Sequence, residues 1–445
     1  MRKIREEQST IFDIIPTIAM SSHFKTISDV LDQVPHVVRT VASDLGFLKA
    51  KHTGRKGLSA ESILRAGIIK QIQQCSYEHL AFCIMDSETM RAFCRTSGRN
   101  VSRSTLQAGI SRIKADTWEK INREILKVAK KEKVENGRVV RTDSTPVETD
   151  IHAPFESDLL GDAVRVMVRW LRDAGKNNPK IRFHDRTRAV KKRVRELWFG
   201  GRKINKKGVY RQLLNHTRET LNWMKTALKV TSMKEGKELI MREKAQRLIH
   251  LVEQAIDQAE RRVLNGEAVP EDEKLFSLFE THTDMIVKGK RDVVFGHKVN
   301  LTAGKSGMIL DLTVETGNPA DSERAVPMIE RQVEIWGKPP RQAVFDGGYA
   351  SKDNLREIKE MGVKDVAFTK KRGIKTEEMA SSKWVYRKLQ NFRAGVESVI
   401  SCMKRAFGWS RCNWKGLQKF KAYTWSATVA YNLAQLARRM NMAAT

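Results

Sequence analysis

Three acidic residues of this chain, Asp143, Asp346 and Glu397, could bind metal ions and so support metal-dependent chemistry. The β-rich run at 138–150 predicts a first strand that ends at Asp143, because Pro146 stops it. Asp346 ends a later buried strand, and Glu397 lies on the helix after the next strand. Ligands of open α/β sheets bind beyond the carboxyl ends of strands, so we expect the three acids to meet there. Clustered carboxylates repel one another unless a cation neutralises them, and oxygen-only ligands favour Mg²⁺ or Mn²⁺. The sequence therefore predicts two Mg²⁺ ions that assist an in-line phosphodiester displacement.

Each acid, taken alone, also has a structural interpretation. Asp143 precedes a Ser-Thr pair and suits an Asx-turn or a helix cap, and Asp346 precedes two glycines, which is ordinary turn chemistry. Glu397 shares one helical face with Arg393 and Lys404, so these residues can simply form surface ion pairs. Beside a phosphate-bearing substrate, the same two cations would hold a nucleic-acid backbone against the metal ions.

The charge balance indicates a polyanionic partner. The 445 residues include 82 Lys and Arg against 52 Asp and Glu, a formal net charge of +30. The densest run spans 186–211, where Glu196 is the one acid. A solvated helix face would explain such a run alone, but with this excess we expect nucleic-acid binding by counterion release. Membrane binding is disfavoured, because no wide apolar helix face accompanies the run. The residues of this run that we expect to bind DNA are Lys191, Lys192, Arg193, Arg202, Lys203, Lys206 and Lys207.

Composition sets further bounds. With 40% hydrophobic residues the chain can build real cores, and its length suggests two or three domains. It contains no apolar run long enough to span a membrane, and its charged start lacks the apolar run of a signal peptide, so we expect a soluble intracellular protein. The five cysteines are never spaced as Cys-x-x-Cys, which argues against a disulfide framework and a zinc cluster. We expect them to be small hydrophobic residues in a reducing cytosol.

The N-terminal part of the chain reads as mostly helical. Helical spacing and serine caps predict short helices at 58–71, 76–85 and 102–113. Such helices, broken by polar turns, fit a helix-turn-helix whose last helix presents Gln107 and Arg112 to a DNA groove. Three-helix clusters are common, so a purely structural cluster remains the alternative.

The rest of the chain divides into a helical block and a later part in which strands and helices alternate. A helical block follows the strand at 138–150 and ends near Gly266. From residue 291 the pattern gives a hairpin, then alternating helices and strands, and two closing helices at about 383–407 and 417–441. This order predicts a largely parallel, helix-covered sheet with the hairpin at its antiparallel edge. The AGKSG stretch at 303–307 is a hairpin turn rather than a P-loop, because the glycine that the motif needs is missing.

Several stretches carry a resemblance to a known family. They are TDST at 142–145, FDGGYAS at 345–351, FRAGVESVISCMKRAFGWSRCNWKG at 392–416, and YTWSATVAYNLAQLAR directly after it. With these motifs the chain resembles a bacterial insertion-sequence transposase of the DDE type. The closing segment is the most specific, because related families show Tyr-x2-Arg-x3-Glu-x6-Lys there. Here Arg393, Glu397 and Lys404 fit, whereas Gln390 stands at the tyrosine position.

The resemblance implies an α/β fold with an RNase H-like mixed sheet, an all-helical N-terminal DNA-binding domain at 1–135, and a large helical insertion at 155–284. The catalytic domain would comprise 136–154 and 285–445. It further implies Asp143, Asp346 and Glu397 as catalytic and metal-binding residues, with Arg393 and Lys404 as their DNA-contacting neighbours. The expected cofactor is two Mg²⁺ ions, for which Mn²⁺ can substitute.

By the same resemblance, the protein would bind the terminal inverted repeats of its own element, cut at their ends and join the 3′-OH to target DNA. It would work as a homodimer or larger synaptic assembly in the bacterial cytoplasm, associated with the nucleoid. One alternative is a structure-selective nuclease of similar fold, which would cut branched DNA without joining strands. The other is an inactive, DNA-binding regulator derived from a transposase.

Overall fold

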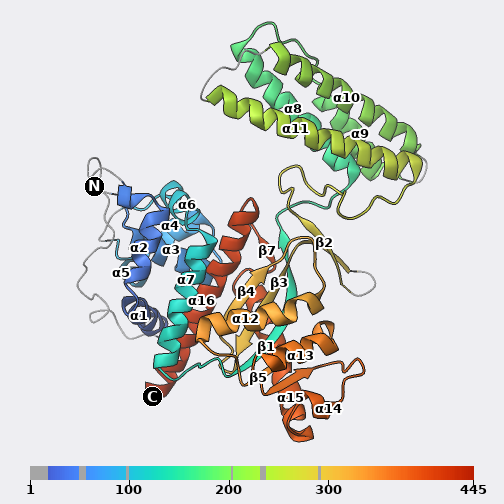
Figure 1. Ribbon diagram of the computed structural model, residues 1–445. Helices are drawn as coiled ribbons and strands as arrows, with labels where there is room; N and C mark the ends of the chain where they lie inside the picture. Colours follow the sequence, from blue (N-terminus) through green and yellow to red (C-terminus); the bar gives the residue numbers. More distant parts are fainter. Residues whose placement is uncertain are drawn as a thin grey trace. The chain divides into compact units, whose positions relative to one another are not determined.

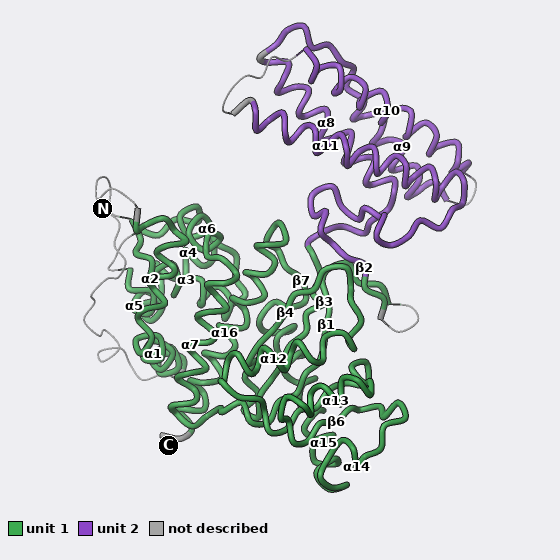
Figure 2. Tube along the Cα trace, viewed as in Figure 1, with its two compact units in different colours: residues 1–149, 286–445 green, residues 150–285 purple. Residues whose placement is uncertain are grey.

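The computed structural model forms two compact units, one of residues 1–149 and 286–445 and the other of residues 150–285 (Figures 1 and 2). The first unit carries a mixed sheet and many helices, and the second carries the helical block. The structure describes residues 19–49, 57–96, 100–201, 204–230, 237–288 and 292–444.

Short helices fill the N-terminal part of the first unit. They are α1 (Ala19–Asp32), α2 (His36–Asp44), α3 (Ala60–Gln73), α4 (Tyr77–Asp86), α5 (Glu88–Cys94), α6 (Arg103–Ile110) and α7 (Ala115–Lys131), with a 3₁₀ turn at Phe47–Lys49. The side chains of Ser59, Ser76 and Ser102 accept the backbone N–H groups that open α3, α4 and α6. The three helices expected from serine caps are therefore confirmed.

Within the part of the chain that the structure describes, seven strands form one sheet. They are β1 (Val139–Thr149), β2 (Asp284–Lys288), β3 (Asp292–Gly304), β4 (Ile309–Val314), β5 (Gln342–Phe345), β6 (Asp365–Phe368) and β7 (Arg411–Cys412). The path runs β2-β3-β1-β5-β6, with β4 paired to β3 and β7 paired to β1. Strands β1, β5 and β6 are parallel, whereas β3 runs antiparallel to both β1 and β4. The mixed sheet and its hairpin were predicted, but the short strands β2 and β7 were not.

Helices of the C-terminal half pack on this sheet. They are α12 (Ala325–Trp336), α13 (Lys352–Glu360), α14 (Thr376–Met379), α15 (Lys383–Ala406) and α16 (Leu417–Ala444), with 3₁₀ turns at Asp321–Arg324 and Gly347–Tyr349. Pro327 does not interrupt α12, because it lies in the first turn, where its missing N–H would have no helical partner.

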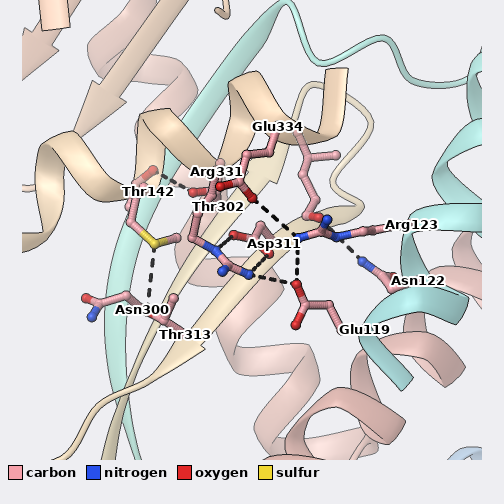
Figure 3. A network of polar contacts seen from close by, with 12 residues as sticks. Glu119, Asn122, Arg123, Thr142, Asn300, Thr302, Asp311, Thr313, Arg331 and Glu334 are labelled. Atoms are coloured by element: carbon pink, nitrogen blue, oxygen red, sulfur yellow. Dashed lines mark hydrogen bonds and ion pairs between the residues drawn. The ribbon is translucent and has the colours of Figure 1, made fainter. Parts of the chain in front are cut away.

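The N-terminal helices share one core with the sheet. Helix α16 packs against α1, α3 and α7. A part-buried polar network also joins α7 to the sheet (Figure 3). In it, Arg331 of α12 donates to Asp311 of β4 and, at 3.0 Å, to Glu119 of α7. Residue 135, where the sequence analysis divided the chain, therefore lies inside one compact unit rather than between two.

Helices make up most of the second unit, and segments without regular structure, such as 266–283, connect them to the first unit's strands. This unit contains α8 (Glu156–Asn177), α9 (Thr187–Phe199), α10 (Lys206–Val230) and α11 (Lys237–Ala259), which a π-helical turn at Glu260–Asn265 extends. Leucine, valine and methionine side chains of these helices form a core of their own. Across the described parts of both units, no helix has the length and apolar character that a membrane span requires. The five cysteines form no disulfide within the described residues, and Cys75, Cys94 and Cys412 are buried, as expected of small hydrophobic residues.

Candidate active site

Strand pairing brings the two aspartates together. In the parallel pair of β1 and β5, Thr142 lies opposite Phe345. The next residues are Asp143, which lies within β1, and Asp346, which directly follows β5, so the two carboxylates lie at neighbouring positions. The predicted end of the first strand at Asp143 was wrong, because β1 continues through Pro146 to Thr149 in its pairing with β3. Asp143 is buried, and its Oδ1 accepts the backbone N–H of Ser144 at 2.8 Å. The sheet therefore fixes this part of the site without help from a flexible loop.

Helix α15 supplies the third acid. It packs against β1, β5 and β6 through an apolar side that includes the buried residues Val396, Val399 and Met403. Glu397 lies on the exposed side of this helix, and Arg393, one turn earlier, points back to the sheet edge. The helical face predicted from the sequence therefore lies over the middle of β1 and the end of β5.

The guanidinium of Arg393 contacts all three acids. Its Nη2 lies 3.0 Å from Asp143 Oδ2 and 3.0 Å from Asp346 Oδ1, and its Nη1 lies 3.0 Å from Glu397 Oε1. The structure thus gathers three acids that are far apart in the sequence around one arginine. The Nε–H of Arg393 is buried and has no acceptor among the described residues.

Burial dominates the electrostatics of Asp143. It raises the pKa of this carboxyl to about 6, since removal from water disfavours the charged form. The Ser144 N–H and Arg393 act in the opposite direction, while the charges of Asp346 and Asp321 raise the pKa further.

Asp321 is an acid near the site that the sequence analysis missed. It lies in the 3₁₀ turn before α12, and its Oδ1 is 3.2 Å from Lys298 Nζ of β3. A β-carbon on Gly348 would lie 2.8 Å from Asp321 Oδ2, so the glycine pair after Asp346 leaves room for this acid. The Gly-Gly dipeptide was the sequence signal, which we interpreted as a turn.

Arg141 and Gly395 fasten α15 to β1. Arg141 donates to the backbone oxygen of Phe392 at 2.9 Å, and its guanidinium lies 4.6 Å from the centre of the Phe392 ring. A β-carbon on Gly395 would lie 2.0 Å from Arg141 Nη1, so the helix can approach only because this residue is glycine. A glycine inside a helical pattern was the signal for this contact.

Gln390, which replaces the expected tyrosine, contacts the sheet. Its Nε2 donates to the backbone oxygen of Phe368 at the end of β6, at 2.9 Å. The hydroxyl of Tyr386, one turn earlier on α15, donates to the same oxygen at 2.9 Å. Gln390 and Tyr386 therefore help to hold α15 in place beside the acids.

The donor set fits a divalent cation in chemistry and charge. Asp143, Asp346 and Glu397 offer carboxylate oxygens, and Arg393 balances part of their negative charge. Within the described residues, however, no three acidic, histidine or cysteine side chains have the arrangement of a metal site. An ion and the present position of Arg393 would compete for the same oxygens.

The other residues expected to bind DNA lie in two groups. In the first unit, Gln107 of α6 and Arg112 just after it are exposed, and Lys404 lies on α15 beyond Glu397. In the second unit, Lys191, Lys192 and Lys206 are exposed, Arg193 pairs with Glu196 at 2.9 Å, and Lys207 donates to the backbone oxygen of Leu264. Arg202 and Lys203 lie outside the described residues.

Comparison with known proteins gives one match. Residues 274–433 match the family model described as "Transposase DDE domain". This segment includes Asp346, Arg393 and Glu397, whereas Asp143 precedes it. No curated protein and no solved structure matches the chain.

Proposed function

The chain carries a transposase DDE domain at residues 274–433, and from this premise we propose that it is an active transposase. It binds the terminal inverted repeats of its own insertion sequence, cleaves the DNA at their ends and joins the freed 3′-OH to target DNA. The observation that carries the proposal is the convergence of Asp143, Asp346 and Glu397 on Arg393. The fold we propose for this part is RNase H-like, which the parallel strands β1, β5 and β6 beside an antiparallel hairpin support.

In this proposal Asp143, Asp346 and Glu397 would be the residues that hold two Mg²⁺ ions. Bound ions of this kind activate the attacking oxygen and stabilise the leaving oxygen of a phosphodiester displacement. The protein contributes rigidity, because Asp143 lies on β1 and Asp346 directly follows β5, the parallel neighbour of β1. Glu397 has the most exposed side chain of the three acids, 67% against 12% for Asp143, so it is the acid with most freedom to adjust.

Arg393 has two roles in this proposal. Before DNA and metal bind, it neutralises the acids. Once they bind, its guanidinium turns to a phosphate of the DNA, for which its planar fork is well suited. The Nε–H of Arg393 is buried and has no acceptor among the described residues. The hydrogen bonds of this side chain are therefore incomplete in the metal-free protein, which supports its second role. Lys404 on the same helix holds the neighbouring DNA backbone.

The remaining basic residues bind DNA away from the chemistry. Helix α6 reads the repeat through Gln107 and Arg112, and the basic run on α9 and the start of α10 clamps the transposon end by counterion release. Because two ends must be joined together, we propose a dimer or larger synaptic assembly, acting on DNA in the bacterial cytoplasm.

Cleavage of repeat-end DNA tests the proposal. Purified protein with a duplex that contains the terminal repeat and Mg²⁺ should nick at the repeat end, and Mn²⁺ should support the same reaction. Asp346→Asn should bind the duplex and leave it intact. Asp353→Asn is the matched control, because this exposed acid on α13 lies outside the site, and its activity should equal that of the wild type.

Three outcomes would contradict the proposal. Cleavage of branched DNA without sequence preference or strand joining would favour a structure-selective nuclease. Tight repeat binding without cleavage by the wild type would favour an inactive regulator. Unchanged cleavage by Asp346→Asn would remove this residue from the catalytic site.

A further inference from the structure

A second cationic site lies in the first unit, outside the cluster of acids. It is a pocket of about 480 Å³ between the N-terminal helices and the segment that joins β7 to α16. We call it the Lys70 pocket. Its lining residues are Lys70, Ser76, Tyr77, Glu78, Arg103, Gln107, Ser111, Asn413, Trp414, Lys415 and Lys419. Four of them are cationic, and Glu78 is the acid among them, so the pocket carries a net positive charge.

Lys70 is a buried cation without an acidic partner. It lies in the last turn of α3 and is 5% exposed, and burial lowers the pKa of its ammonium group. Its ammonium lies 4.9 Å from the centre of the Tyr77 ring. Among the described residues, no carboxylate pairs with it, and Glu78 instead lies 4.0 Å from Arg103 at an exposed position. A buried charge without a counter-charge costs stability, so the presence of Lys70 at this position favours a role in binding an anion.

Independent features of the pocket also suit an anion. Trp414 is buried, and its indole N–H has no acceptor among the described residues. The N-terminal ends of α4 and α6 both reach the pocket, through Tyr77 and Arg103, and helix N-termini carry partial positive charge. Donors, cations and helix ends therefore surround the same space.

The position of the pocket indicates which anion it serves. Gln107, one of the residues expected to read DNA, lines it directly from α6. On the other side, the segment with Trp414, Lys415 and Lys419 follows β7, which pairs with β1, the strand of Asp143. A DNA backbone that enters the pocket would therefore contact both the proposed reading helix and a segment joined to the catalytic sheet.

We propose that the Lys70 pocket binds a backbone phosphate of duplex DNA, with Lys70 as its buried counter-charge and Lys415, Lys419 and Arg103 at its rim. The proposal rests on the proposed function in one respect, that the protein binds DNA. The volume accommodates a phosphate with a flanking sugar, since pockets of about 300 Å³ and more hold small organic ligands. Because phosphate contacts carry no sequence information, this site strengthens binding to any duplex.

DNA binding by Lys70→Met tests the proposal. Fluorescence anisotropy is measured at several salt concentrations on a duplex with the terminal repeat and on a scrambled duplex. We expect the variant to bind both about tenfold more weakly, with a salt slope smaller by about 0.9, the value for one phosphate contact. Its melting temperature should equal or exceed that of the wild type, because methionine removes the cost of burying the charge.

Lys419→Gln and Lys352→Gln complete the experiment. The first removes a charge from the pocket, at the start of α16, and should weaken binding to both duplexes. The second removes an exposed charge on α13, away from the pocket, and should bind as the wild type does. Lys70→Met and Lys419→Gln with wild-type affinity and salt slope would overturn the inference, as would a loss confined to the repeat duplex, since that would indicate base reading.

The two proposals fail in different ways. If the wild type binds both duplexes through the pocket but never cleaves the repeat end, the transposase proposal fails and the phosphate site stands. If it cleaves normally while the pocket variants bind as the wild type does, the phosphate site fails and the transposase proposal stands.

Discussion

Replacing Arg393 with methionine should make the acidic site bind divalent metal more tightly. In the metal-free protein, Arg393 neutralises Asp143, Asp346 and Glu397, so an incoming ion must first displace its guanidinium. Methionine has a similar length and carries no charge, so the variant keeps the packing of α15 and loses this competitor. In the metal-free variant, the three carboxylates therefore have no cation from residue 393 to balance their charge.

The size of the effect follows from burial. The side chains of Asp143 and Arg393 are 12% and 17% exposed, so their contact is nearly screened from water. The side chains of Asp346 and Glu397 are 40% and 67% exposed, so solvent screens their ion pairs with Arg393 and these pairs contribute little energy. Removing one partner of a buried pair costs about 3 to 5 kcal/mol, and we take the lower figure because the site is open on one side. About 3 kcal/mol corresponds to metal binding up to about a hundredfold tighter.

Isothermal titration calorimetry with Mn²⁺ measures this affinity in wild type and variant. Thermal unfolding supplies a second readout, because Arg393→Met should melt at a lower temperature without metal and recover more with Mn²⁺ than the wild type does. Arg331→Met is the matched control. Arg331 also joins two acids, Asp311 and Glu119, but away from the active site (Figure 3), so its loss should destabilise the protein without improving Mn²⁺ binding.

Two results would refute this reasoning. Mn²⁺ binding by Arg393→Met that is equal to or weaker than that of the wild type would show that the arginine does not compete with metal. Equal tightening in Arg331→Met would show that a general loss of positive charge, rather than this contact, controls the affinity.

Two more predictions concern the residues that position the site, and a third concerns helix α8. Because burial raises the pKa of Asp143 to about 6, the folded protein keeps a proton that the unfolded chain releases near pH 4, so the metal-free protein should lose about 3 kcal/mol of stability as the pH rises from 4 to 6. Denaturant titrations should find a smaller loss in Asp143→Asn, and an unchanged loss would contradict the assignment. Gly395→Ala should destabilise the protein by about 1–3 kcal/mol. The new β-carbon would lie 2.0 Å from Arg141 Nη1, and the cost of this clash exceeds the gain in helix propensity. Gly175→Ala, whose β-carbon would meet nothing closer than 4.0 Å, should instead stabilise helix α8 by about 1 kcal/mol.

The local elements follow closely from the sequence. The helices that begin after Ser59, Ser76 and Ser102 form where the caps predict them, because a cap and its first turn are neighbours in the chain. The hairpin of β3 and β4 and the helical block were predicted for the same reason, since their patterns extend over a few consecutive residues. Strand β7 was missed because its two residues depend on pairing with β1, which lies far away in the chain. Strand β2 has no such reason, since its partner β3 follows it directly.

The sequence also determined which residue types could carry the chemistry, and the placement of Asp143 and Asp346 at the ends of β-type runs made their approach a reasonable expectation. The tertiary structure decided what lies beside them. It brought Arg393 into contact with all three acids, placed Asp321 near Asp143, and seated Arg141 against Gly395. These contacts join residues that lie far apart in the chain, so no local pattern of hydrophobicity or charge records them. Burial raises the pKa of Asp143 and lowers the pKa of Lys70, and burial exists only once the chain is packed.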